Sequence, residues 1–172
     1  HQHPEHMGGV RPFMEEGTTI VTTEGNRSYF QGIARNRHLF SKDVRVKKFI
    51  SPKFLFVTLN KQEIKAGDRV IQFYLLNKLS RHTDEYIISY IPSEKILIEG
   101  DLVKTWSLRE RTLDSKERGL VQFIDEMKIN VKQVVQTWPI EKSPDMFDYD
   151  VIKPEPSNKL LKGTKKVLDA FN

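Results

Sequence analysis

Three strand-like segments joined by short polar turns occupy residues 69–101, and they constrain the fold more than any other feature of the chain. "RVIQFYLL" (69–76), "EYIISYIP" (85–92) and "KILIEGD" (95–101) are rich in β-branched and aromatic residues. Pro92 and Ser93 close the second segment with residues that favour turns. This part of the chain is therefore predicted to be β-structure.

Helical patterns stand on both sides of these strands. Near the start, apolar residues recur at helical spacing from Val10 to Met14, and Gly17 stands where a C-terminal cap is expected. Later, Asp114 and Glu117 form a capping-box pattern before an apolar stripe. A further helix is predicted around residues 29–34, and further strands at residues 18–23, 54–59, 63–68 and 131–138. The fold class is therefore α/β (α+β).

The C-terminal part has a different composition. The segment "SPDMFDYDVIKPEPS" (143–157) is rich in Pro and Asp and is predicted to be a loop. A last helix should follow, on which the apolar residues are Leu160, Leu161, Val167, Leu168 and Phe171. We therefore expect one main domain over residues 1–142, with a loop and a C-terminal helix at 143–172 packing on it.

Charge and composition exclude several classes of protein. The net charge of +5 is spread along the chain without a block of five like charges, whereas a nucleic-acid interface would concentrate its basic residues, so no specific nucleic-acid partner is expected. No apolar run approaches the ~18 residues of a membrane span. The chain has no cysteine, so any metal must be held by histidine and carboxylate.

The chain opens on "HQHPEHMGG", which places three histidines and a carboxylate within six residues. Residues i and i+2 of an extended segment project to the same side, so His1 and His3 can point their imidazoles at one ion. Two other candidates lie at loop ends of strands: His82 in the turn "SRHTDE", and Asp101 in "LIEGDLV". Alternatives remain open. The opening stretch can be an expression-tag remnant, His82 can be a histidine in a surface turn, and Asp101 can be an aspartate that caps a turn at the end of a strand.

These residues resemble those of a known family. "HQHPEHMGG" is similar to the His-x-His-x-Asp-His signature of the metallo-β-lactamase fold with its trailing glycines, and the likeness continues through "RHTDEYIISYIPSEKILIEGDLV" to about residue 138. The resemblance implies an αββα sandwich with a metal site at one edge of the sheets. Because the chain starts on the signature itself, it is expected to be the C-terminal portion of such a domain, lacking the N-terminal sheet.

The resemblance also implies ligands and roles. The first metal position corresponds to His1, His3 and His82, the second to Glu5 and His6, and Asp101 would bridge both. Glu5 and Asp101 are the implied catalytic residues, beside a zinc-activated water. Two departures weaken the second position: Glu5 stands where the signature has Asp, and "VVQTWPIE" offers Trp138 where the last histidine is expected. One zinc per chain is therefore predicted.

Two functional hypotheses follow from this resemblance. The first is a zinc-dependent hydrolase acting on a small-molecule substrate, with an altered metal site. The second is a catalytically degenerate domain that keeps the fold for binding or assembly. An incomplete sandwich would leave one sheet face uncovered, so the chain is expected to associate with the missing N-terminal half or with itself.

Overall fold

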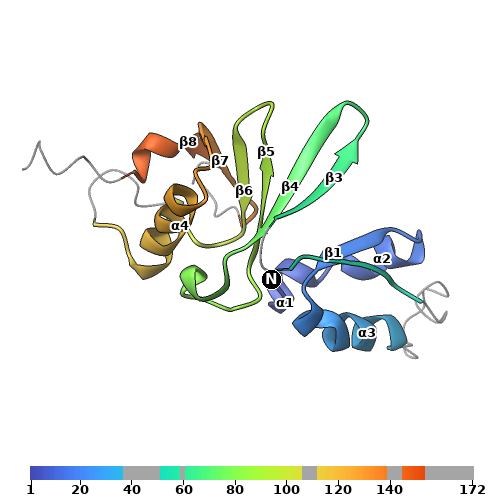
Figure 1. Cartoon of the computed structure of the whole chain (residues 1–172). Coiled ribbons are helices and arrows are strands. Elements are labelled where there is room, and N and C mark those ends of the chain that lie inside the picture. Colours follow the sequence, from blue (N-terminus) through green and yellow to red (C-terminus); the bar gives the residue numbers. More distant parts are fainter. Residues whose placement is uncertain (37–50, 59–60, 106–111, 139–144, 154–172) are drawn as a thin grey trace, which may run out of the picture.

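The structure is a computed structural model, which describes residues 1–36, 51–58, 61–105, 112–138 and 145–153. Two β-sheets form its centre, one of six strands and one of two. Helix α4 (Ser115–Glu126) packs on one side of the six-stranded sheet, and the N-terminal helices lie on the other side with the two-stranded sheet (Figure 1). Among the described residues, no helix has the length and apolar character that crossing a bilayer requires.

The six-stranded sheet has its strands in sequence order. They are β3 (Lys61–Ala66), β4 (Arg69–Leu75), β5 (Ile87–Ile91), β6 (Ile96–Glu99), β7 (Gln133–Gln136) and β8 (Met146–Asp148). All neighbouring pairs are antiparallel except β6 and β7, which are parallel. The connection between two parallel strands must cross the sheet, and α4 lies in this connection. This crossover places α4 against the sheet.

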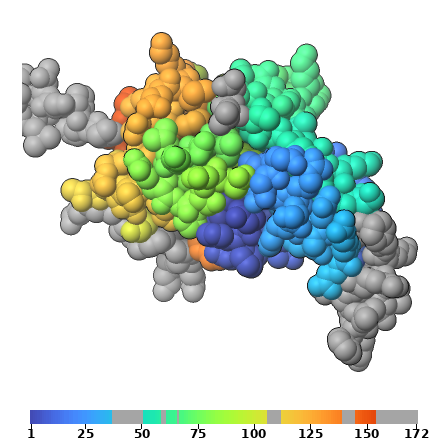
Figure 2. Space-filling view, turned by 60° about the horizontal axis from the view of Figure 1, so that its bottom comes forward, coloured from blue at the N-terminus to red at the C-terminus, as the bar shows by residue number. Residues whose placement is uncertain are grey.

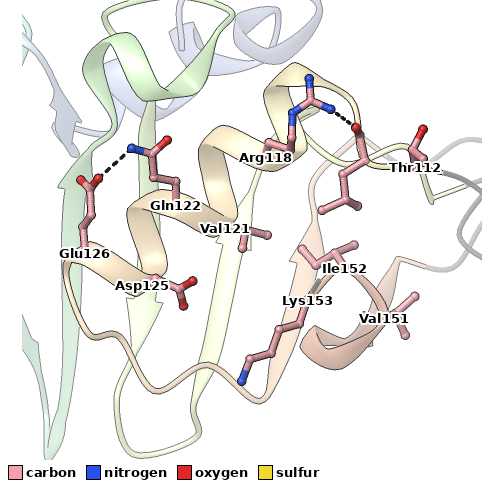
Figure 3. Close-up of a pocket in the computed structure, with 10 residues that line it drawn as sticks. Thr112, Arg118, Val121, Gln122, Asp125, Glu126, Val151, Ile152 and Lys153 are labelled. Carbon is pink, nitrogen blue, oxygen red and sulfur yellow. Dashed lines mark hydrogen bonds between the residues drawn. The ribbon is translucent and has the colours of Figure 1, made fainter. Parts of the chain in front are cut away.

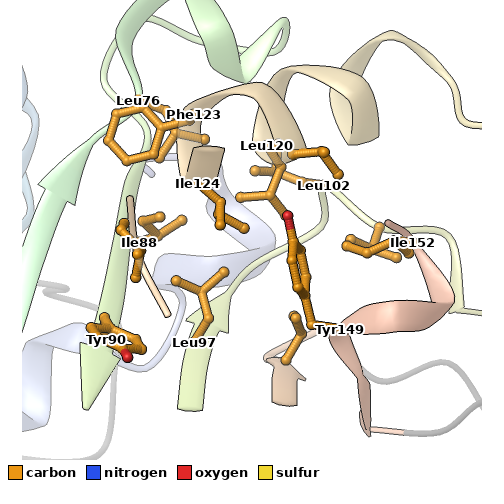
Figure 4. Packing of buried hydrophobic residues seen from close by; sticks show 14 of the residues in the cluster. Leu76, Ile88, Tyr90, Leu97, Leu102, Leu120, Phe123, Ile124, Tyr149 and Ile152 are labelled. Atoms are coloured by element: carbon orange, nitrogen blue, oxygen red, sulfur yellow. The ribbon is translucent and has the colours of Figure 1, made fainter. Parts of the chain in front are cut away.

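Apolar side chains between α4 and the sheet form the main core. Alternate residues of β5 and β6 are fully buried here, and Ile88 and Leu97 have no exposed surface (Figure 4). The predicted capping box is present: Asp114 Oδ1 accepts from Glu117 N at 3.0 Å, and Glu117 Oε2 accepts from Asp114 N at 2.9 Å. The other carboxylate oxygen of Glu117 accepts from Lys104 N, so the start of α4 also holds the loop after β6.

The N-terminal part forms the second layer. Its elements are α1 (Pro4–Met7), α2 (Val10–Glu15), β1 (Thr19–Thr22), the 3-10 turn η1 (Glu24–Asn26), α3 (Arg27–Arg35) and β2 (Lys53–Phe56). Strands β1 and β2 pair in parallel. A smaller core of Met14, Phe30 and Ala34 joins the two longer helices to this sheet. The opening residues lie between the two layers, beside the six-stranded sheet.

Most predicted elements agree with the structure, and one prediction is wrong. The strands and helices expected before residue 138 are present, with ends shifted by a few residues. The segment 143–157, predicted to be a loop, contains strand β8, which is only three residues long and pairs with the edge of β7. The helix predicted near the C-terminus lies outside the described residues. The division at residue 142 remains a prediction.

Candidate metal centre

The three opening histidines are brought together by an extended start and a short helix. His3 has extended backbone angles and immediately precedes α1, whose first residue is Pro4. The His1 ring lies 4.4 Å, centroid to centroid, from the rings of both His3 and His6. It also stacks on the ring of Tyr86 at 4.6 Å, and its side chain is only 1% exposed. Tyr86 therefore fixes the imidazole on which the other two histidines converge.

His82 reaches the same point from the loop between β4 and β5. This loop begins with the 3-10 turn η3 (Asn77–Ser80), after which Arg81 adopts a left-handed conformation with φ of 52°. The Ser80 hydroxyl oxygen accepts hydrogen bonds from His82 N and Thr83 N, both at 3.1 Å, and donates to Thr83 O at 2.6 Å. Ser80 is 1% exposed, so a buried side chain holds the backbone from which the His82 imidazole projects.

Asp101 follows β6 in a tight turn built around one hydroxyl group. Gly100 N and Asp101 N both donate to the Tyr86 hydroxyl oxygen at 2.9 Å. The Tyr86 hydroxyl lies 3.1 Å from Asp101 Oδ1 and 3.3 Å from Glu99 Oε2, and it has one proton to share between them. A Cβ at Gly100 would lie 2.6 Å from this hydroxyl oxygen, so the turn requires glycine here.

The donor atoms of these segments converge within bonding distance of one ion. His82 Nε2 lies 3.2 Å from His1 Nε2 and 3.2 Å from Asp101 Oδ2. Two ligands ~2.1 Å from a tetrahedral zinc lie ~3.4 Å apart, so these separations suit a shared metal. The donor atoms form two groups, each within 4.8 Å: His1 with His3 and His82, and His1 with His6 and Asp101.

The electrostatic environment favours neutral imidazoles, the form that binds metals. Burial lowers the pKa of His6 and of His82, although the Asp101 carboxylate opposes both shifts. His6 Nε2 is buried and has no hydrogen-bond partner among the described residues, which leaves a lone pair for an ion. Imidazole and carboxylate ligands suit zinc and also iron. The residues present therefore fit a divalent metal.

One cation of the chain itself already lies beside Asp101. Lys116, in the first turn of α4, donates from Nζ to the Asp101 carbonyl oxygen at 2.9 Å, and its Nζ is 3.6 Å from Asp101 Oδ2. Behind this turn, Glu99 is 2% exposed, and burial raises the pKa of its carboxyl group to about 8, so it is mostly protonated at neutral pH. Asp101 therefore carries the negative charge of this turn.

Glu5 and Trp138 lie at the edge of the histidine cluster. The Glu5 side chain is 43% exposed, and its Oε1 is 3.8 Å from His3 Nδ1. Glu5 also lines a hollow of about 280 Å³ together with His1, His6 and Tyr86. The Trp138 ring lies 5.0 Å from the His6 ring, centroid to centroid, so an aromatic side chain contacts the second candidate position. The opening residues form part of the surface between the two layers (Figure 2, dark blue).

The structure brings together the six predicted site residues but adds three that the sequence analysis missed. His1, His3, His6, His82 and Asp101 form the two groups, and Glu5 lies beside them. Tyr86, Glu99 and Lys116 were missed, because each reads locally as an ordinary strand or helix residue. A carboxylate within the apolar strand "ILIE" and a tyrosine immediately before β5 were the available signals.

Replacing Tyr86 by phenylalanine should destabilise the fold by about 2 kcal/mol, because two partly buried backbone N–H groups lose their acceptor. The midpoint of urea unfolding measures this change. Tyr29→Phe is the matched control, since this half-buried tyrosine lies away from the Asp101 turn. Equal midpoints for both variants would contradict the role given to the Tyr86 hydroxyl.

Comparison with known proteins gives the same fold. No protein-family model matches the sequence, and no curated protein matches it. Among solved structures, a metallo-β-lactamase from Pontibacter korlensis is similar with a TM-score of 0.57 and 20% identity, over 88% of this chain and 62% of that chain. The DIM-1 metallo-β-lactamase exposed to ceftazidime is similar with a TM-score of 0.54 and 15% identity, over 88% of this chain and 61% of that chain.

This chain therefore spans about three fifths of the length of those two proteins. At such identities the likeness concerns the fold and not the substrate. The order of the elements, the placement of the histidine cluster between the layers and the structural matches agree with one another. The chain has the fold of the metallo-β-lactamase superfamily.

Proposed function

We propose that this chain is a metal-dependent hydrolase domain with one zinc site. The observation that carries the proposal is the convergence of His82 and Asp101 on His1, which lies 81 residues before His82 and 100 residues before Asp101. A site that only stabilised the fold would not need a group of imidazoles at the edge of a hollow. The metal-binding character of the fold supports the same conclusion, whereas the choice of zinc rests on the imidazole donors.

His1, His3 and His82 are the proposed ligands, and Asp101 is the carboxylate beside them. When bound, the metal supplies Lewis acidity and activates water at neutral pH. The protein residues then have separate tasks: Tyr86 and Lys116 hold Asp101 in place, and Glu5, from the rim of the hollow, accepts the proton of the attacking water. The hollow of about 280 Å³ suits a small-molecule substrate.

One metal per chain is the expected stoichiometry. His1 belongs to both candidate groups, and each residue offers one ligand atom. Two metal ions would therefore compete for the His1 imidazole. The second group also faces the Trp138 ring. Elemental analysis after dialysis against a weak chelator should find about one equivalent of zinc. Two equivalents retained would show that another ligand completes the second position, and iron in place of zinc would correct the metal.

The hydrolase proposal is tested with the zinc-loaded chain on lactam, thioester, lactone and phosphodiester model substrates. Hydrolysis of one class above the rate of the metal-free chain supports the enzyme. The competing proposal is a degenerate domain that serves binding or assembly, and the contact of Trp138 with His6 favours it. If zinc binds but no substrate class is turned over, this second proposal holds, with self-association or a further segment as its partner.

A further inference from the structure

Two hollows lie in different parts of the described structure. The larger one, of about 730 Å³, runs between α4 and the 3-10 turn η5 (Tyr149–Val151), and none of the candidate metal ligands lines it (Figure 3). Its charged lining is mixed, with Arg118 and Lys153 beside Asp125 and Glu126. This hollow therefore favours no ligand of one charge.

The smaller hollow, beside the histidine cluster, contains a buried carboxyl group that has no role in the proposed chemistry. Its volume is about 280 Å³, and Glu99 lines it together with His1 and His6. Glu99 is only 2% exposed. Burial of a carboxyl group costs free energy unless hydrogen bonds compensate it, so the hydrogen bonds of Glu99 indicate what this residue does.

The hydrogen bonds of Glu99 enclose the backbone of Asp101. Glu99 Oε2 accepts from Leu102 N, directly after Asp101, at 2.7 Å. The same oxygen lies 3.3 Å from the Tyr86 hydroxyl oxygen, which accepts from Asp101 N at 2.9 Å. One carboxyl oxygen is thus linked to the N–H groups on both sides of the Asp101 side chain. Glu99 and Tyr86 together therefore set the direction in which this side chain leaves the backbone.

The direction of the Asp101 side chain decides whether its carboxylate reaches the metal centre. Asp101 Oδ2 lies 3.2 Å from His82 Nε2, and groups at a metal site must be held within ~0.5 Å of their working positions. Glu99 itself belongs to neither group of candidate ligands among the described residues. Its contribution to the centre is therefore expected to pass through Asp101.

We propose that Glu99 is a positioning residue of the metal centre, whose Oε2 holds the turn after β6 so that the Asp101 carboxylate faces the histidines. This inference rests on the proposed metal site. The role requires an acceptor oxygen at the reach of a glutamate side chain, and a glutamine side chain provides one as well.

The neighbouring strand supplies a matched control. Gln136 of β7 is the pairing partner of Glu99 and is 3% exposed. Its side chain donates from Nε2 to Val103 O at 2.8 Å and accepts from Thr105 Oγ1 at 2.9 Å, so these bonds do not include the backbone N–H groups beside the Asp101 side chain. Loss of either buried polar side chain should destabilise the fold, but only loss of Glu99 should weaken metal binding.

The test measures the zinc affinity of the whole chain by competition with a chromogenic chelator, at a temperature at which thermal unfolding shows each variant to be folded. Glu99→Leu should lower the affinity by at least ~10-fold, as expected for loss of a residue that supports a ligand. Gln136→Leu should leave the affinity unchanged. Glu99→Gln should keep the affinity of the parent chain, because its amide oxygen can accept from Leu102 N.

Glu99→Asp gives the same test without an apolar substitution, and it decides together with Glu99→Gln if Glu99→Leu does not fold. The shorter side chain withdraws the carboxylate from Leu102 N, so the affinity should again fall by ~10-fold.

Four results would overturn the inference. Parent-like affinity in Glu99→Asp and Glu99→Leu would leave the proposed metal site standing but remove the role of Glu99. An equal fall in Gln136→Leu would make the effect a general one of the core, and an equal fall in Glu99→Gln would make Glu99 a direct ligand. If the parent chain binds no zinc, the proposed metal site fails, and Glu99 then has no ligand to position.

Discussion

His82→Ala is expected to lower the affinity of the chain for zinc by more than ~100-fold, since loss of a direct ligand should cost at least as much as loss of a supporting residue. Its Nε2 lies 3.2 Å from both His1 Nε2 and Asp101 Oδ2, so its removal takes one of the three nitrogen ligands from the group of His1, His3 and His82. Competition with a chromogenic zinc chelator measures the affinity.

The fold should survive this substitution. The Ser80 hydroxyl holds the backbone of the loop through His82 N and Thr83 N, and these bonds do not involve the imidazole. The His82 side chain is 22% exposed, so the free energy of unfolding without metal should change by less than about 1 kcal/mol. A loss of zinc binding in His82→Ala would therefore result from the missing imidazole ligand and not from a disrupted loop.

His38→Ala is the matched control, because it removes an imidazole that belongs neither to the opening motif nor to the turn of His82, and that lies outside the described residues. It should leave zinc affinity unchanged. If His82→Ala also binds zinc as the parent chain does, His82 is not a ligand, and the proposed three-nitrogen site is wrong.

The fold was predictable wherever one segment carries its own signal. Strands β5 and β6 alternate between a face buried against α4 and a half-buried face, and their β-branched residues made them readable. Asp114 and Glu117 predicted the start of α4 because a capping box is complete within four residues. Strand β8 was missed, because its three residues carry no period of their own and depend on pairing with β7.

The candidate site was predictable only through the family motif. Spacing alone suggested that His1 and His3 share a side, but the approach of His82 and Asp101 depends on the β4–β5 and β6–α4 loops meeting at one edge. The residues that hold Asp101 were not predictable from the sequence. The Tyr86 hydroxyl contacts Asp101 from beside the neighbouring strand, and the Lys116 ammonium contacts it from helix α4. Such contacts are tertiary and leave no local pattern.

Glu5→Gln is expected to lower turnover by ~10²-fold on whichever substrate class the zinc-loaded chain hydrolyses, because an amide of the same size cannot accept a proton. Zinc content should remain near one equivalent, since Glu5 lies outside both groups of donor atoms among the described residues. Its side chain is 43% exposed, so the unfolding temperature should not change. The change should appear in kcat, measured with the zinc content of the same sample.

Glu16→Gln is the matched control, as another exposed glutamate at the end of α2, and it should keep the parent rate. The readouts separate three roles for Glu5. If Glu5→Gln has lower turnover but retains zinc, Glu5 is the proton acceptor. If the variant loses both zinc and turnover, Glu5 is a metal ligand. If the variant keeps both zinc and the turnover of the parent chain, the Glu5 carboxylate has no part in the chemistry. The base would then have to be Asp101, whose Oδ1 and Oδ2 already face His1 and His82.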